Sequence, residues 1–309
     1  MVPQEVTMQN MTATQLAPLI SSYIPAKGNP NRVVVKNLSQ LSPLLEVELS
    51  GKLIKKQLCT SIDAQGKRSF RLAAQNGKYK RTSGDGDLHF CVGTTNGKVH
   101  VPCEIQAATN EMIQTFNDNI GSSISVTGFF RCLFEHSGIV QTNNSDCHIF
   151  EIHPVRAVTI AGSTFAFEVD SPDDAGIHDG WMRGTVSLED TDKLIQIQKT
   201  APSITFEGVQ SDAQGGDVNY VRIKGAVSAV KTIPSSGGAR QFTFTINDTG
   251  GHGKDVRAIC LPHTTAARDV ANAEGHNATL IALRNIDLKK ALTGKYVINL
   301  LAIEFEHIS

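Results

Sequence analysis

Two short stretches of the chain pair an acidic residue with a histidine two positions later: Asp87 with His89, and Glu151 with His153. Residues two apart in a strand point to the same face, so each pair would present a carboxylate beside an imidazole. Together with Glu104, these groups could bind a divalent metal such as Zn, Mn or Fe. The alternative is that they hydrogen-bond to one another at the end of a β-barrel, and we favour it because the chain has no HExxH or other established metal spacing.

Established catalytic motifs are missing from the sequence. It has no GxSxG elbow, no P-loop, and no GxGxxG followed by a suitable βαβ unit. Its six cysteines form no CxxC pair, which argues against a zinc ribbon and indicates reduced, buried thiols. We therefore expect no catalytic residues, no cofactor and no enzymatic activity.

Basic residues gather between positions 52 and 81, in a chain whose net charge is only -1. A groove for single-stranded nucleic acid needs cations along the phosphates and exposed aromatic rings on which bases stack. The candidates in and near this segment are Lys52, Lys55, Lys56, Lys67, Arg68, Phe70, Lys78, Tyr79, Lys80, Arg81 and Phe90. A second, weaker set is Arg222, Lys224, Arg240, Phe242 and Phe244, although alternating phenylalanines on strands usually belong to the core.

The elements that must position these residues are short runs in which apolar and polar residues alternate, bounded by Gly, Asn, Asp and Ser. Such runs predict strands. In the first half they cover 44–58, 87–93, 98–105, 123–134 and 147–160, with a helical pattern over 110–120 between the third and the fourth. The same order returns at 220–233, 239–248, 254–261, 277–286 and 295–308, with a helical pattern over 264–274. Three strands, a helix and two strands therefore occur twice.

This order resembles the OB fold, a five-stranded Greek-key barrel with a helix between its third and fourth strands. The first strand of each copy also carries a glycine near its middle, Gly51 or Gly225, where a barrel strand must bend. Over about 45–160, the strings SGDGDLHF at 83–90 and FEIHPV at 150–155 resemble a pattern in uncharacterised bacterial OB-like domains. The resemblance implies a fold and no activity. Because the third OB strand pairs with both the second and the fifth, Glu104 would lie between the two acid/histidine pairs.

We therefore predict an all-β protein with short helices, made of two OB-type five-stranded Greek-key barrels in tandem and a β-rich connector. Its expected parts are an N-terminal helical arm at 1–30, a first barrel at 31–161, the connector at 162–217 and a second barrel at 218–309. The connector could form a small bridging layer or extend the first barrel. The opening residues lack the pattern of a signal peptide and no later segment has the length of a membrane span, so we expect a cytoplasmic protein without membrane partners.

The function that these features favour is non-catalytic binding of single-stranded nucleic acid in an OB groove of the first barrel. The alternative is a structural or assembly protein whose barrels serve as docking modules for a second copy or another protein, since the near-neutral charge suits protein partners. A metal-dependent hydrolase at Asp87, His89, Glu104 and His153 is a third possibility. The sequence leaves DNA versus RNA, and the oligomeric state, open.

Overall fold

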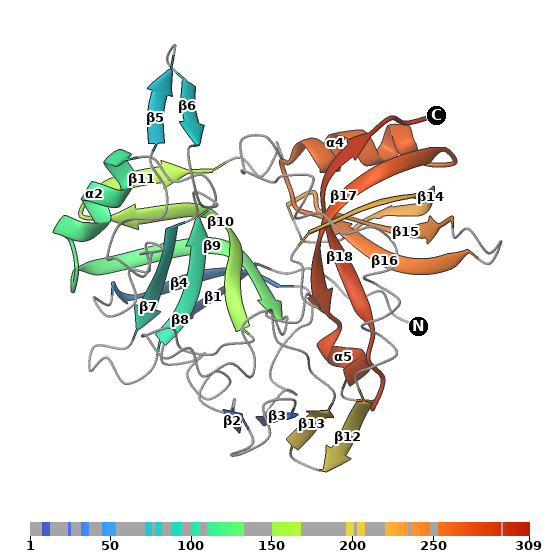
Figure 1. Cartoon of the computed structure of the whole chain (residues 1–309), viewed down its shortest axis with the longest axis horizontal. Coiled ribbons are helices and arrows are strands. Elements are labelled where there is room, and N and C mark those ends of the chain that lie inside the picture. The colour runs from blue at the N-terminus through green and yellow to red at the C-terminus, as the bar shows by residue number, and fades with distance from the viewer. Residues whose placement is uncertain are drawn as a thin grey trace.

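The structure is a computed structural model of the whole chain. It describes residues 8–12, 24–25, 32–36, 45–53, 72–75, 78–81, 88–93, 100–105, 110–132, 150–167, 196–200, 203–207, 220–233, 237–247, 253–291 and 293–309. Strands dominate these residues (Figure 1). None of the helices among them is both long enough and apolar enough to cross a membrane.

Five strands of the first half close into a barrel. They are β4 (Leu45–Leu53), β7 (Leu88–Gly93), β8 (His100–Ile105), β9 (Ser123–Cys132) and β10 (Phe150–Ile160), with helix α2 (Asn110–Asp118) between β8 and β9. β4 pairs with β7, β7 with β8, β8 with β10, β10 with β9, and β9 with β4 again. The β8–β10 pair is parallel and the other four are antiparallel, which is the OB order of strands.

The second half repeats this arrangement. Its strands are β14 (Tyr220–Thr232), β15 (Arg240–Ile246), β16 (Lys254–Cys260), β17 (Asn277–Ile286) and β18 (Ile298–Glu306), with helix α4 (Thr265–Ala273) before β17 and the short α5 (Leu288–Ala291) after it. They close in the order β14-β15-β16-β18-β17, and β16 runs parallel to β18. The predicted fold class, with two tandem OB-type barrels, is confirmed.

Local sequence explains the main features of both barrels. In α2, Ile113 and Phe116 are buried, and the ring of Phe116 meets that of Phe90 edge-on at 4.8 Å between centroids. α4 begins behind Thr264, whose hydroxyl accepts a hydrogen bond from the Ala267 N–H and so caps the helix. At Gly225 a side chain is impossible, because a Cβ would lie 2.3 Å from the Thr245 carbonyl oxygen on the neighbouring strand.

Further strands lie outside the two barrels. They are β1 (Met8–Thr12), β2 (Ile24–Pro25), β3 (Arg32–Lys36), β5 (Leu72–Gln75), β6 (Lys78–Arg81), β11 (Ser163–Ala166), β12 (Gln196–Thr200) and β13 (Ser203–Glu207). β1 pairs in parallel with β4, and β11 extends the first barrel beside β10. A separate sheet has the order β12-β13-β3-β2.

The predicted helical arm at 1–30 is described only at 8–12 and 24–25, and both segments are strands. β1 is held by main-chain pairing with the free edge of β4, which a helix could not provide. The stretch expected to form the helix is 12–24; its two end residues belong to β1 and β2, and residues 13–23 lie outside the described residues. Strand β3, which the predicted boundaries assign to the first barrel, pairs with β13 of the predicted connector.

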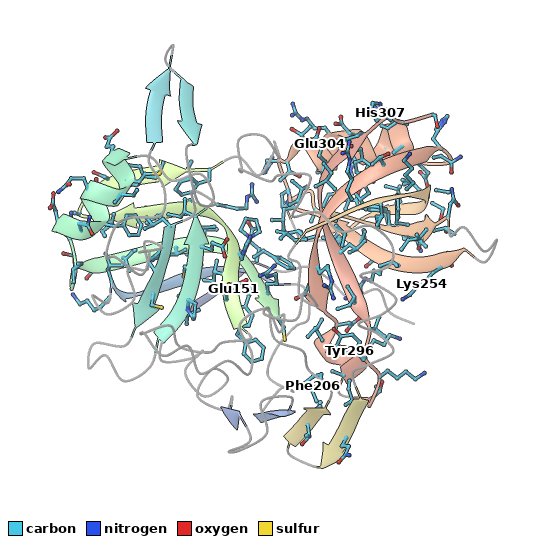
Figure 2. All side chains as sticks on the ribbon, viewed as in Figure 1. Glu151, Phe206, Lys254, Tyr296, Glu304 and His307 are labelled. Atoms are coloured by element: carbon cyan, nitrogen blue, oxygen red, sulfur yellow. The ribbon has the colours of Figure 1, made fainter. Side chains whose placement is uncertain are left out.

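The outer faces of the two barrels meet. On β16, β17 and β18, the outward-facing Ile259, Ile281, Leu283, Leu301 and Ile303 are all at most 2% exposed, and Phe129 of β9 in the first barrel belongs to the same hydrophobic cluster. Figure 2 shows Glu151 on the side of the first barrel that faces the second. We call this contact the barrel interface. It makes the two barrels one packed body.

Polar contacts between described residues also cross the barrel interface. The Asn285 side-chain oxygen of β17 accepts a hydrogen bond from the Cys132 N–H of β9, at 2.9 Å. Arg156 of β10 donates both to the Glu46 carboxylate of its own barrel, at 2.7 Å, and to the Pro262 carbonyl of the other, at 2.9 Å. Directional contacts of this kind fix the register in which the apolar faces meet.

Candidate functional site

Strand register brings four ionisable side chains together on the outer face of the first barrel. Glu104 lies on β8, Arg131 on β9, and Glu151 and His153 on β10. β8 and β10 pair in parallel at Cys103 and Ile152. The next residue of each strand, Glu104 on β8 and His153 on β10, therefore lies beside the other. Glu151 lies directly opposite Arg131 in the antiparallel pair of β9 and β10.

These four side chains point outward because their neighbours point inward. Cys103, Phe130 and Ile152 belong to the hydrophobic core of the barrel, and successive residues of a strand face opposite sides. An outward position would normally be solvated, yet here Arg131 and His153 are 0% exposed, and Glu104 and Glu151 are 4% and 5% exposed. The outer face is therefore covered. We call Glu104, Arg131, Glu151 and His153 the buried ion network.

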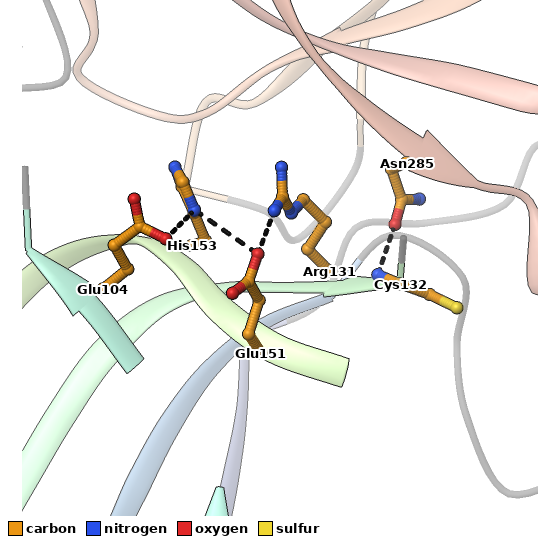
Figure 3. A network of polar contacts seen from close by, with 6 residues as sticks. All are labelled: Glu104, Arg131, Cys132, Glu151, His153 and Asn285. Atoms are coloured by element: carbon orange, nitrogen blue, oxygen red, sulfur yellow. Dashed lines mark hydrogen bonds and ion pairs between the residues drawn. The ribbon is translucent and has the colours of Figure 1, made fainter. Parts of the chain in front are cut away.

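The network is continuous through His153 (Figure 3). Its Nδ1 lies 2.9 Å from Glu104 Oε2 and 3.4 Å from Glu151 Oε1. Arg131 donates through Nη2 to the same Glu151 oxygen. Cys132 follows Arg131 in the sequence, and its N–H donates a hydrogen bond to Asn285 of the second barrel. The network therefore borders the second barrel. Its charges are two carboxylates against a guanidinium and an imidazolium.

Electrostatics hold a proton on His153. Burial by itself lowers the pKa of a histidine, and the positive charge of Arg131 also lowers it. The Glu104 charge and the hydrogen bonds to Glu104 and Glu151 outweigh both effects and raise the pKa of His153 to about 9. At neutral pH the network is therefore balanced in charge, which is the condition under which ions can be buried at acceptable cost.

Three members of the network have the donors for a metal ion. Atoms of Glu104, Glu151 and His153 lie within 4.8 Å of one another. The described contacts fit such an ion poorly: His153 must lose its proton to ligate, while Arg131 already occupies a Glu151 oxygen and would lie beside a divalent charge. The contacts of His153 and Arg131 with these carboxylates are compatible with the hydrogen-bonded alternative, which stays a prediction.

The structure gathers part of the predicted acid/histidine cluster. Glu104, Glu151 and His153 are together, Asp87 lies outside the described residues, and His89 is described through its backbone, which pairs with Glu104 across β7 and β8. Arg131 and Phe129 were not predicted as site residues. Arg131 could have been noticed as a cation inside the apolar run GFFRCLF, where a buried charge needs a partner.

The nucleic-acid candidates are distributed over the chain from β4 to β7. On β4, the Lys52 ammonium donates to the Ser123 hydroxyl at 3.0 Å. Strand β6 is formed by Lys78, Tyr79, Lys80 and Arg81 and pairs with β5 as a two-stranded hairpin. The candidates that lie outside the described residues are Lys55, Lys56, Lys67, Arg68 and Phe70.

The prediction for Phe90 is wrong. It was predicted as a stacking platform, but it is 1% exposed and packs against Phe116 inside the barrel. It shares its face of β7 with the fully buried Leu88 and Val92, and this inward face offers nothing to a base. In the second barrel, Phe242 and Phe244 are likewise buried in the core.

Comparison with known proteins gives no family. No family model matches the chain, and no curated protein sequence does. Among solved structures, the chain is similar to a deletion mutant of the single-stranded DNA binding protein from Thermus aquaticus, with 10% identity, 93% of this chain and 96% of that chain covered, and a TM-score of 0.22. The wild-type protein matches at 11% identity, with 87% and 95% covered and a TM-score of 0.22. A likeness this loose says nothing about what the present chain binds.

Proposed function

We propose that this protein binds single-stranded nucleic acid without catalysis, through the connection between the first and second strands of its first barrel. The observation that carries the proposal is the β5–β6 hairpin. It is inserted between β4 and β7, and Figure 1 draws it away from the body of the barrel. The connection between strands one and two is one of the loops with which OB barrels contact oligonucleotides.

The charge of this connection suits a polyanion. Between positions 54 and 87 the sequence has eight lysines and arginines against three acidic residues, Asp63, Asp85 and Asp87, although the chain as a whole is nearly neutral. A local concentration of cations on a projecting hairpin can follow a phosphate backbone, and each phosphate neutralised releases counterions. Tyr79 within β6 supplies an aromatic ring for stacking among these cations.

The test is a titration of fluorescently labelled oligothymidylate by anisotropy, at several salt concentrations. We expect binding that weakens steeply with salt. The variant Lys78→Ala/Lys80→Ala/Arg81→Ala should bind at least tenfold more weakly, and its salt slope should be shallower by about 2, since each single-strand phosphate contact contributes roughly 0.7.

A matched pair of variants separates stacking from charge. Tyr79→Ala should weaken binding, because a base stacked on an aromatic ring is worth about 1–3 kcal/mol, whereas Tyr79→Phe keeps the ring and should bind as the unmodified protein does. Circular dichroism controls for folding. Absence of binding at low salt, or an unchanged affinity in the triple variant, would rule the proposal out.

A further inference from the structure

The second barrel has the same topology as the first, yet its exposed features are different. The corresponding connection, between β14 and β15, is only the seven residues 233–239, with the sequence IPSSGGA and no charged residue. The first barrel has 34 residues, 54–87, at this point, including the basic hairpin. The loop that would carry a phosphate track in the second barrel is thus short and neutral.

The outer face of β15 and β16 also lacks what a base-binding groove needs. The aromatic residues of β15, Phe242 and Phe244, point into the core. Apart from Ile259, which lies in the barrel interface, the described outward positions are Gln241, Thr243, Thr245, Asp255 and Arg257, and none of these is aromatic. Single-stranded nucleic acid bound to OB folds relies on stacking as well as on charge, so this face offers little to a base.

Two pairs of polar groups on this face hydrogen-bond to each other. Arg257 donates to the Gln241 side chain at 2.7 Å, and burial lowers the pKa of this arginine. The Thr245 hydroxyl donates to Asp255 at 2.7 Å. Asp255 adds a negative charge near one end of the face, which would repel a phosphate there.

Other parts of the second barrel are used for packing inside the chain. The outer face of β16, β17 and β18 forms the barrel interface with Phe129. In the connection between β17 and β18, Tyr296 packs against the hydrophobic cluster that includes Ile204 and Phe206 of β13. Figure 1 shows α5 of this connection at the end of the barrel near β12 and β13. Surfaces that OB modules often turn toward ligands are thus partly taken up by neighbouring parts of this chain.

We infer that the second barrel is the permanent docking partner of the first and that nucleic acid contacts only the first barrel of each chain. This inference rests on the proposed function and restricts it. The neutral loop, the polar β15–β16 face and the buried outer face each point the same way. The second barrel keeps exposed lysines, among them Lys224 on β14, Lys290 in α5 and Lys295 after α5, and these provide a sharp test.

The experiment compares two triple variants that each remove three positive charges from the full chain. One is Lys78→Ala/Lys80→Ala/Arg81→Ala in the hairpin, and the other is Lys224→Ala/Lys290→Ala/Lys295→Ala in the second barrel. Labelled oligothymidylate is titrated at several salt concentrations. We expect the hairpin variant to lose at least tenfold in affinity and the second-barrel variant to change by less than twofold, with an unaltered salt slope.

The possible failures are distinguishable. If the second-barrel variant also binds more than fivefold more weakly, with a shallower salt slope, both barrels bind and the inference is overturned while the proposed function stands. If the unmodified chain does not bind at low salt, the proposed function itself fails, and the inference with it. Thermal unfolding of both variants shows whether a loss of affinity comes from a loss of folding.

Discussion

His153 is the residue whose environment has the most direct physical consequence. It is completely buried, and its Nδ1 lies close to the carboxylates of Glu104 and Glu151, which stabilise the protonated imidazole. Because the pKa of His153 is about 9 in the folded chain and about 6.5 in an unfolded chain, the folded state binds this proton more tightly. The stabilisation is fully present below pH 6.5 and disappears as the pH rises through 9.

We therefore predict that the free energy of unfolding falls between about pH 6.5 and about pH 9.5, by up to about 3 kcal/mol from this group. Urea denaturation at a series of pH values measures it. The variant His153→Gln should be less stable at neutral pH, because Glu104 loses its cationic partner, and should lack this part of the pH dependence. His263→Gln, which removes an exposed histidine, is the matched control. An equal pH dependence in His153→Gln and the unmodified chain would contradict the assignment.

At the scale of elements, the contact between β9 and the second barrel depends strongly on Phe129. This ring is fully buried although it points away from the core of its own barrel. We predict that Phe129→Ala destabilises the chain by about 3–5 kcal/mol, as for other buried phenylalanines, and separates the unfolding of the two barrels. Differential scanning calorimetry would show two transitions.

The neighbouring Phe130 gives a matched control for this prediction. It faces the interior of the first barrel, where its ring stacks on Phe150 with 5.6 Å between centroids. Phe130→Ala should cost a similar amount of stability by weakening the first barrel itself, without loosening the interface. If Phe129→Ala left stability unchanged, the ring would not be an anchor of the barrel interface.

The order of elements could be predicted from the sequence because each element carries its own local pattern. Alternation marked the ten barrel strands, and helical spacing marked α2 and α4. The assignment of faces was harder. β9 has apolar residues at consecutive positions, Phe129 and Phe130, so its alternation does not say which of them faces the core. Phe90, in contrast, alternates with Leu88 and Val92, so the pattern already favoured the core face, and its prediction as an exposed ring was wrong.

The buried ion network was predictable only in part, for a related reason. Spacing of two indicated that Glu151 and His153 share a face, and the OB order of strands brought Glu104 beside them. Nothing local indicated that a second barrel would cover that face. Burial of these charges, and the need for Arg131 as a partner, arise from a contact between segments 153 residues apart, at Cys132 and Asn285.

At the scale of the whole molecule, the two barrels share a hydrophobic cluster and polar contacts, so they should unfold together. We predict a single cooperative calorimetric transition for the unmodified chain, with equal calorimetric and van't Hoff enthalpies. Two transitions in the unmodified chain would mean that the barrel interface contributes little to cohesion. Raising the pH toward 9 should lower the transition temperature as His153 loses its proton.

The sheet that joins β3 to β13 constrains how this protein can be synthesised. Its partner strands lie about 170 residues apart in the chain. At a ribosomal speed of about 5–20 residues per second, β3 emerges on the order of 10 to 30 seconds before the strand that will cover its edge. A nascent chain must protect the apolar run of Val33, Val34 and Val35 during that delay. We expect that slowing translation between these two strands increases aggregation of the nascent protein more than slowing it within the second barrel.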